Sequence, residues 1–329
     1  MKALILNRYG GKLIYGESPL PKILDNNEVL VKMKFSPINP ADIYFTKGMY
    51  GILKKLPVVA GMEGVGTIEQ FSDELKGICK PGTKVAILCT KQGDGTWAQF
   101  CKTTLDRCLI LDDDIDLRQG ACAMVNPLTA IGMIEEVQAK NVDCVIQTAA
   151  SSAVAKMFYR LCKTESIRCI NIVRKPEQVE LLKQEEADIV LNSTSDQFDA
   201  ELRAAITKFK PKIMFDAVAG EITAKILPLM PRESTCYIYG SLSHAYMAGI
   251  NPKDFIFEKK TIRGFYLEDF IEGKNLFKED RLSQKVNNYL RKGLLTTVIH
   301  NEYQPQEVNE AIAYYLKNMS KGKILLNFS

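Results

Sequence analysis

The segment from residue 143 to residue 175 constrains the fold most, because it has the pattern of a strand, a helix and a second strand. An apolar run at 144–147 leads into small residues and then into an amphipathic helical stretch that extends to about Cys162. A second apolar run covers 169–173. This order predicts one βαβ unit of a parallel sheet.

Small residues fill the turn after the first apolar run. The spacing of Ala149, Ser152 and Ala155 predicts a tight turn with little side chain, which lets backbone N–H groups and a helix amino terminus approach a pyrophosphate. The alternative explanation is that the small residues only let a helix pack closely on a sheet. The residues that we expect to bind the cofactor in this turn are Ala149, Ala150, Ser151, Ser152 and Ala153.

Two basic residues, Arg174 and Lys175, end the second apolar run. Enzymes that use NAD carry an acidic residue at this place, whereas a basic residue suits a 2′-phosphate. The pair therefore predicts NADPH as the cofactor. Charged residues at strand ends are also commonly just solvated.

The composition is that of a globular protein, with 329 residues, 46% hydrophobic residues and a formal net charge of +4. The length is sufficient for two domains. The small, dispersed charge gives no indication of nucleic-acid binding, and the longest apolar runs are strand-sized, so we expect no membrane span. The start of the chain, 1–11, reads as a strand and a turn and not as a signal peptide, which predicts a cytoplasmic protein.

The cysteines and histidines argue against a metal site. The nine cysteines contain no C-x-x-C pair, and several lie in apolar runs where a reduced, buried cysteine is ordinary. The two histidines, His244 and His300, are not near a pair of cysteines. We therefore expect no zinc.

The pattern along the chain changes near Pro127. Before it, short alternating strands are separated by turn residues and predict a β-rich domain, with one helix around 40–47. After it, strands alternate with helices such as 176–184 and 197–209, which predicts a doubly wound parallel sheet. The six expected strands lie near 144–148, 168–173, 189–192, 212–216, 235–239 and 261–266.

The last segment, 271–329, contains two helical patterns and a closing strand at 323–328. A lone terminal strand needs a sheet to join, so we expect it to return to the first domain. The predicted domains are therefore 1–122 with 267–329, and 123–266. Ligands of open α/β sheets bind at the carboxyl ends of the strands, which here also carry the predicted cofactor residues Tyr239, Gly240 and Ser241.

Several stretches resemble the medium-chain dehydrogenase/reductase superfamily over almost the whole chain, and most closely its zinc-free quinone oxidoreductase and enoyl thioester reductase branches. The resemblance implies a GroES-like β-rich catalytic domain followed by a Rossmann-type domain. The matching stretches are SPINPADIYFTKGMY (36–50), GMEGVGTI (61–68), KPGTKVAIL (80–88), GTWAQF (95–100), VNPLTAIGM (125–133), FDAVAGE (215–221), YGSLS (239–243) and IRGFYLEDF (262–270).

The resemblance also shows where this chain departs from its relatives. Zinc-dependent members carry a histidine where this chain has Met62, and their first cysteine ligand is missing from the region 38–42. Ala155 and Ala219 replace two glycines of the branch, and each added methyl group reduces the approach of the backbone to a cofactor.

The resemblance implies a catalytic role for Tyr50, which matches the proposed catalytic tyrosine of enoyl thioester reductases. A phenol can stabilise the enolate that forms when hydride reaches an activated alkene, or deliver a proton to it. Tyr44 is the second candidate, and Tyr50 could instead only pack on a loop. We expect Asn39, Tyr44, Asn126 and Thr129 to line the nicotinamide cleft.

Together these features predict an NADPH-dependent enzyme that reduces an enone, an enoyl thioester or a quinone as its small-molecule substrate. The alternative is a family member with impaired catalysis that serves as a structural subunit of a larger assembly or as a nucleotide-sensing module. By analogy with the family we expect a homodimer that pairs the strand 261–265.

Overall fold

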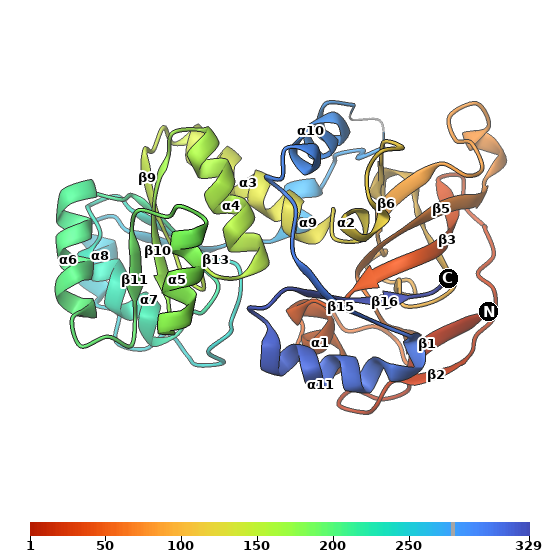
Figure 1. Cartoon of the computed structure of the whole chain (residues 1–329), viewed down its shortest axis with the longest axis horizontal. Coiled ribbons are helices and arrows are strands. Elements are labelled where there is room, and N and C mark those ends of the chain that lie inside the picture. Colours follow the sequence, from red (N-terminus) through yellow and green to blue (C-terminus); the bar gives the residue numbers. More distant parts are fainter. Residues whose placement is uncertain (278–279) are drawn as a thin grey trace. The chain divides into compact units, whose positions relative to one another are not determined.

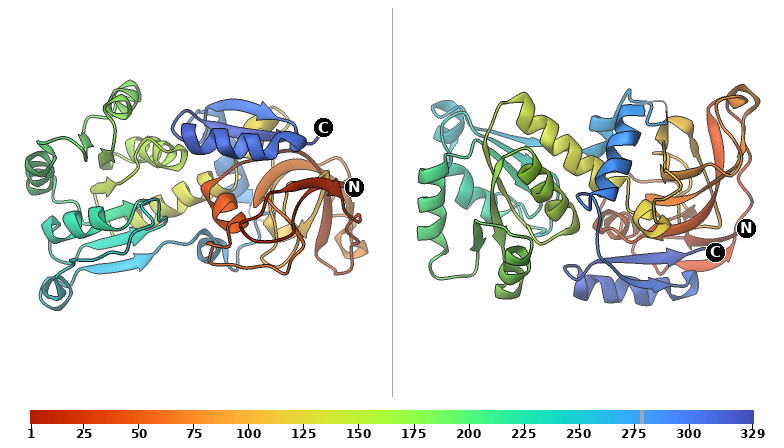
Figure 2. Two further views of the ribbon diagram at one scale, coloured as in Figure 1. Left: turned by 90° about the horizontal axis from the view of Figure 1, so that it is seen from below. Right: turned by 45° about the horizontal axis from the view of Figure 1, so that its top comes forward.

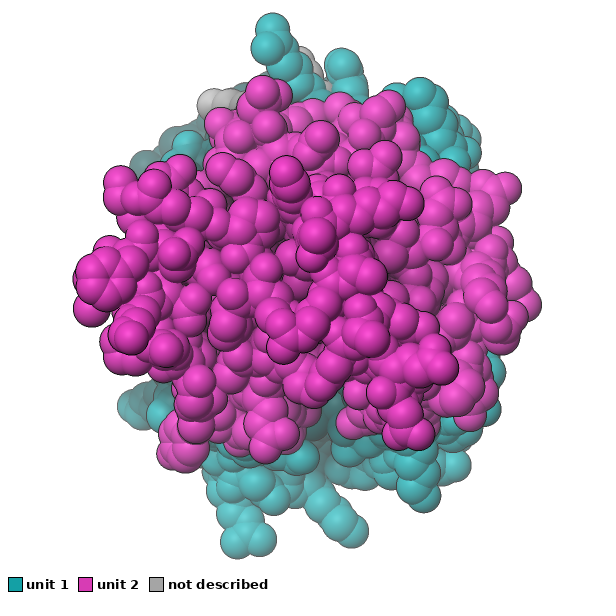
Figure 3. Space-filling model, turned by 90° about the vertical axis from the view of Figure 1, so that its left-hand side faces the viewer, with its two compact units in different colours: residues 1–128, 271–329 teal, residues 129–270 magenta. Residues whose placement is uncertain are grey.

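The computed structural model describes residues 1–277 and 280–329, and the chain forms two compact units. The first unit contains 1–128 and 271–329, and the second contains 129–270 (Figure 3). The units divide at 128/129 and 270/271, whereas we predicted domain limits at 122/123 and 266/267.

The second unit is built on a six-stranded sheet in the order β11-β10-β9-β12-β13-β14 (Figure 1). All five neighbouring pairs are parallel, which confirms the predicted doubly wound sheet. The strand order reverses between β9 and β12, so this is where a Rossmann-type sheet opens a crevice for a ligand. The strands are β9 (Cys144–Gln147), β10 (Arg168–Val173), β11 (Val190–Asn192), β12 (Ile213–Asp216), β13 (Thr235–Ile238) and β14 (Thr261–Gly264).

Helices cover both faces of this sheet because its strands are apolar on both sides. On one face Ile170 and Met214 belong to the same core as Phe198 of α6. On the other face Phe215 contacts Phe158 of α4, with ring centroids 5.0 Å apart. The helices of this unit are α4 (Ala153–Thr164), α5 (Pro176–Gln184), α6 (Phe198–Phe209), α7 (Glu221–Ile226), α8 (Pro252–Ile256) and α9 (Leu267–Ile271), and a 3-10 turn, η3, spans Leu227–Leu229.

Helix α3 (Val125–Ala139) is the longest helix in the described part of the chain and was not predicted. It is apolar around most of its circumference, so it lacks the periodicity that reveals an amphipathic helix. Gly132 allows close packing, because a Cβ atom there would lie 2.8 Å from Phe265 and 3.0 Å from Phe270. Neither α3 nor any other helix of residues 1–277 and 280–329 has the length and apolar character needed to cross a bilayer.

The first unit contains two sheets. The larger one has the order β15-β16-β3-β5-β6-β8, with β7 also paired to β3, and the smaller one has the order β2-β1-β4. A shared core that includes Leu4, Ile87 and Trp97 lies between them. The strands are β1 (Lys2–Leu6), β2 (Ile14–Glu17), β3 (Glu28–Pro37), β4 (Val58–Val59), β5 (Glu63–Phe71), β6 (Lys84–Leu88), β7 (Phe100–Thr104), β8 (Cys108–Ile110), β15 (Ile299–Tyr303) and β16 (Lys323–Asn327).

The carboxyl-terminal segment 271–329 belongs to the first compact unit. Strand β16 pairs with β3 on one side and with β15 on the other (Figure 2). We had not predicted β15, whose sequence IHNEY has no alternation of apolar and polar residues. The helices of this unit are α1 (Pro40–Thr46), α2 (Leu117–Ala121), α10 (Asp280–Arg291) and α11 (Val308–Asn318), with 3-10 turns η1 (Asp73–Leu75), η2 (Leu105–Arg107) and η4 (Pro305–Glu307).

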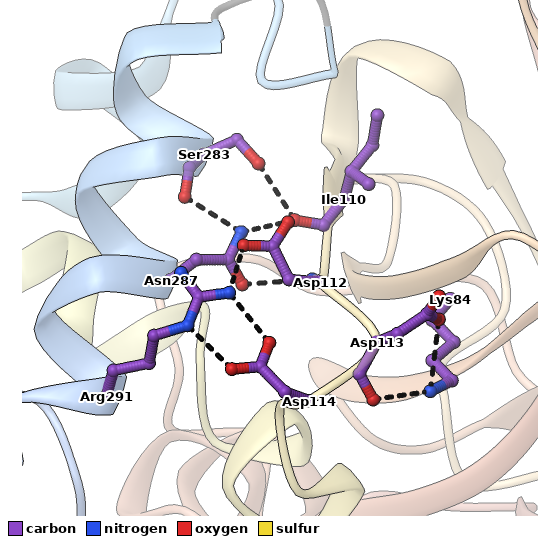
Figure 4. A network of polar contacts seen from close by, with 8 residues as sticks. All are labelled: Lys84, Ile110, Asp112, Asp113, Asp114, Ser283, Asn287 and Arg291. Atoms are coloured by element: carbon purple, nitrogen blue, oxygen red, sulfur yellow. Dashed lines mark hydrogen bonds and ion pairs between the residues drawn. The ribbon is translucent and has the colours of Figure 1, made fainter.

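Helix α10 docks on the end of β8 through polar side chains spaced four residues apart (Figure 4). Ser283 and Asn287 donate hydrogen bonds to the carbonyl oxygen of Ile110, at 2.8 and 3.0 Å. Arg291, one turn further on, pairs with Asp114 at 2.7 Å. Helix α10 therefore forms hydrogen bonds with the backbone at the end of β8, in addition to the ion pair with a side chain.

Candidate active site

The turn between β9 and α4 has the small-residue geometry that the sequence predicts. Its second residue, Ala149, has a left-handed backbone with φ of 48°. Ser152 is the N-cap of α4, and its side chain accepts a hydrogen bond from the amide of Ala155 at 3.3 Å. Within the described residues, the amides of Ala153 and Val154 have no hydrogen-bond partner. These two N–H groups at a helix amino terminus form a suitable cradle for a phosphate group.

The methyl group of Ala155 does not obstruct this cradle. Ala155 is 1% exposed and lies inside the first turn of α4. Its carbonyl oxygen accepts a hydrogen bond from Gln147, at 3.1 Å. The third glycine of a dinucleotide turn serves the packing of helix on strand, and here that packing accommodates a methyl group.

Asp216, at the end of β12, joins two of the loops at this edge of the sheet. One carboxylate oxygen accepts hydrogen bonds from Thr148 at 2.6 Å and from the amides of Val218 and Ala219 at 2.8 and 3.0 Å. The other accepts from Thr223 at 2.6 Å. The buried carboxylate is therefore satisfied by its own neighbours, and it holds Ala219 in a left-handed conformation with φ of 60°.

The predicted residues after β13 lie at the same edge. Burial raises the pKa of the Tyr239 phenol. Gly240 approaches the neighbouring strand so closely that a Cβ atom would lie 2.8 Å from the carbonyl oxygen of Ala217. Ser241 follows directly and is exposed. Tyr239 thus lies at the same edge of the sheet as the turn between β9 and α4.

Arg174 and Lys175 follow β10 directly and are exposed. Their backbone amides both donate to the side chain of Gln178, at 3.1 Å, and the hydroxyl of Thr194 donates to the carbonyl oxygen of Arg174. Neither charged side chain has an ion-pair partner among the residues that the structure describes. The backbone is therefore held while both cations stay available to an anion.

The other predicted residues are placed by α1, by the loop after it and by the first two turns of α3. Asn39 is the buried N-cap of α1, Tyr44 lies within that helix and Tyr50 lies in the loop after it. Tyr50 is half-buried against the core of the first unit. Asn126 belongs to the first turn of α3 and Thr129 to its second. Burial raises the pKa of Tyr44.

Glu63 links these two helices, and we had not predicted it as a site residue. Its carboxylate accepts a hydrogen bond from the side chain of Asn39 at 2.7 Å and from the amides of Met124 and Val125 at 3.2 and 2.8 Å. The side-chain oxygen of Asn39 in turn accepts a hydrogen bond from Lys323 of β16. The carboxylate thus positions both the helix that carries Tyr44 and the start of α3.

The cluster also contains a carboxyl group, that of Asp42, whose pKa lies well above its ordinary value. Asp42 is completely buried and accepts the amide of Asn39 at 2.8 Å through one oxygen. Its other oxygen has no hydrogen-bond partner in the described part of the chain. Burial, and then the charge of Glu63, raise the pKa of Asp42 to about 7. Burial likewise raises the pKa of Glu63 itself.

The nine cysteines are all buried as free thiols. Within residues 1–277 and 280–329, no three side chains of His, Cys, Asp or Glu gather as metal ligands.

Both units match known family models. Residues 25–113 match the alcohol dehydrogenase GroES-like domain, and residues 153–280 match the zinc-binding dehydrogenase family. The mitochondrial enoyl-acyl-carrier-protein reductase of Rattus norvegicus is 29% identical over 339 residues, which cover 99% of this chain and 88% of that protein. The same enzyme of Caenorhabditis elegans is 31% identical over 252 residues, covering 74% of this chain and 71% of that protein.

A solved structure gives the same result. A protein from Mesorhizobium loti that is assigned as an NADPH:quinone reductase has a TM-score of 0.90, with 31% identity and coverage of 99% of this chain and 98% of that chain. A GroES-like unit with a Rossmann-type unit defines the class of two-domain dehydrogenases and reductases. The chain belongs to the medium-chain dehydrogenase/reductase superfamily, in the branch of quinone oxidoreductases and enoyl reductases.

Proposed function

We propose that this protein is a zinc-independent reductase that uses NADPH to reduce an activated carbon–carbon double bond or a quinone. The cofactor assignment rests on two features at the carboxyl ends of the strands in the second unit. Two backbone amides at the start of α4 have no partner in the described residues, and Arg174 is exposed. The first feature suits a pyrophosphate and the second a 2′-phosphate. Relatives named enoyl reductases and NADPH:quinone reductases support the reaction class.

Each group of site residues would have its own role in binding or catalysis. Ala149 to Ala153 would hold the pyrophosphate, and Arg174 with Lys175 would hold the 2′-phosphate. NADPH, when bound, supplies a hydride. Tyr50 would donate a hydrogen bond or a proton to the carbonyl oxygen of the substrate, where negative charge develops.

The cofactor assignment is tested by titrating the purified protein with NADPH and with NADH. We expect Arg174→Ala to weaken NADPH binding by about tenfold to a hundredfold, because it removes charge-assisted hydrogen bonds to a phosphate. NADH lacks that phosphate and should bind almost unchanged. Arg203→Ala, which removes another exposed arginine on α6, serves as the control. Equal weakening of both nucleotides would contradict the assignment.

The reaction is tested by following NADPH oxidation with a panel of enones, enoyl thioesters and quinones. We expect Tyr50→Phe to lower kcat by about a hundredfold or more while NADPH binding is kept. Tyr44→Phe separates the two tyrosine candidates, since only the one that serves the substrate should give this result. No oxidation by the wild-type protein with any substrate would rule out the proposed reaction.

The alternative of a family member with impaired catalysis receives no support from the comparisons. The buried position of Ala155 also removes part of its basis, because the lost glycine does not block the phosphate cradle.

A further inference from the structure

The loop that carries Tyr50 begins at a sharply defined helix end. Gly48 has a left-handed backbone with φ of 72°, and its amide donates to the carbonyl oxygen of Phe45 at 2.9 Å. The amide of Met49 donates to the carbonyl oxygen of Tyr44 at 2.8 Å. These two bonds are those of a Schellman motif, which fixes the direction in which the chain leaves α1.

Tyr9, in the turn after β1, contacts both ends of this loop. A Cβ atom at Gly48 would lie 3.0 Å from Cβ of Tyr9, so the glycine backbone rests directly on the tyrosine. The Tyr9 hydroxyl accepts a hydrogen bond from the amide of Lys54 at 2.7 Å and donates one to the carbonyl oxygen of the same residue at 2.8 Å. One side chain therefore holds positions 48 and 54 together.

The side chain of Lys54 fastens the same end of the loop to a second segment. Its ammonium group donates to the carbonyl oxygens of Gly93 at 2.6 Å and Thr90 at 3.1 Å, and it lies 3.7 Å from Sγ of Cys89. It also lies 5.7 Å from the ring centroid of Phe45 in α1. All three donors of the ammonium group are thus directed at groups that belong to the 89–93 turn.

Several residues between these two anchors are exposed to solvent. Met49 and Leu53 are 59% and 60% exposed, and Gly51 is exposed as well. Tyr50 is half-buried against the core of the first unit. Its placement therefore depends both on this packing and on how firmly the ends of the loop are held.

We propose that Tyr9 and Lys54 are positioning residues that clamp the loop 48–54 and thereby fix Tyr50 for catalysis. The inference rests on the proposed function, because it takes Tyr50 to be the residue that serves the substrate. A misplacement of about 1 Å in a catalytic group can cost about a hundredfold in rate, so holding the ends of a partly exposed loop can have a large effect on kcat.

Two substitutions remove the clamp in different ways. Lys54→Met keeps the length and the apolar stem of the side chain but removes its three donors. Tyr9→Phe keeps the ring under Gly48 but leaves the amide and carbonyl groups of Lys54 without their partner. Lys55→Met is the matched control, because the neighbouring lysine is exposed and makes none of these contacts.

The variants are compared by hydrogen exchange of the amides at 49–54 and by steady-state kinetics well below the unfolding temperature. We expect faster exchange in this segment and a fall in kcat of about tenfold to a hundredfold for Lys54→Met and Tyr9→Phe. The Kd of NADPH should stay within about twofold, and Lys55→Met should match the wild type. Tyr9→Phe provides the test if Lys54→Met does not fold.

Two results would overturn the clamp. Unchanged exchange in both variants would show that the contacts do not hold the loop, and faster exchange with unchanged kcat would show that holding the loop does not position a catalytic group. Failure of the proposed function looks different, because the wild-type protein would then oxidise no NADPH while the exchange experiment still reports on the clamp.

Discussion

Two alanines in the loops that follow β9 and β12 adopt a backbone conformation that glycine adopts without strain. Ala149 and Ala219 have φ of 48° and 60°, where a Cβ atom costs about 1 kcal/mol. We expect Ala149→Gly and Ala219→Gly each to raise the free energy of unfolding by about 0.5–1 kcal/mol, as measured by urea denaturation.

A third alanine provides a control, because its replacement by glycine should change the free energy of unfolding in the opposite direction. Ala155 lies in α4 with a helical backbone, so Ala155→Gly should lower the free energy of unfolding by about 1 kcal/mol. If all three substitutions destabilised the protein equally, the left-handed alanines would not be strained.

The buried carboxyl group of Asp42 predicts how stability depends on pH. Its pKa is raised from 3.8 to about 7 in the folded protein, mainly by burial, so the folded state binds more protons than the unfolded state between these values. The contribution of Asp42 to stability is therefore largest at low pH and is lost as the pH rises through this window, by up to about 1.4 kcal/mol per pH unit.

Asp42→Asn removes this dependence while keeping an acceptor for the amide of Asn39. We expect the free energy of unfolding of the variant to rise relative to that of the wild type as the pH increases from about 4 to about 7. Glu63 is present in both proteins, so its own shifted pKa largely cancels in the difference. A difference that stays constant with pH would contradict the prediction.

At the scale of the element, local signals determined which parts were predictable. Helix α5 begins with Pro176, where proline is favoured, and its predicted range 176–184 agrees with the structure. Helix α3 was missed because its burial on most sides hides the helical period, and β15 because its residues are half-exposed without alternation.

The site residues also separate into those that a local sequence pattern predicts and those that it does not. The small-residue turn and Arg174 follow from a short, continuous pattern at 149–174, and the structure places Tyr239 after β13, at the same edge of the sheet. The role of Glu63 could not be predicted, because it depends on Asn39 and Lys323, which are 284 residues apart in sequence. Buried charge is recognisable only when such distant segments are placed together.

The docking of α10 offers a test at this scale. Asn287 is 2% exposed, and it joins the carbonyl oxygen of Ile110 to the amide of Asp112. Asn287→Ala leaves the amide of Asp112 without this acceptor and takes one of two side-chain donors from the carbonyl oxygen of Ile110, so it should lower the free energy of unfolding by about 1–2 kcal/mol.

Arg291 offers the comparison, because its ion pairs with Asp112 and Asp114 are exposed to solvent. Exposed pairs contribute little, so Arg291→Met should destabilise the protein much less than Asn287→Ala in the same urea titration. The opposite order would mean that the ion pairs, and not the buried amide, hold α10 in place.

At the scale of the whole molecule, the edge strand of the second unit's sheet is the strand that we expect to pair in a homodimer. Strand β14 is the last strand of that sheet and is largely exposed. The amides of Thr261 and Phe265 point toward β13, where they donate to Ser234 and Ile238. Because N–H directions alternate along a strand, the amide of Gly264 points away from β13, toward any partner strand.

This direction allows a dimer to be tested at a single position. Gly264→Pro removes an outward donor without touching the pairing with β13, whereas Gly264→Ala keeps the donor and places its methyl group in open space. We expect light scattering to give twice the 36.9 kDa chain mass for the wild type and Gly264→Ala, and the monomer mass for Gly264→Pro. A wild-type monomer would exclude the dimer, and a dimeric Gly264→Pro would argue for an interface elsewhere, because a proline at an outward position removes a ladder hydrogen bond and disfavours strand pairing.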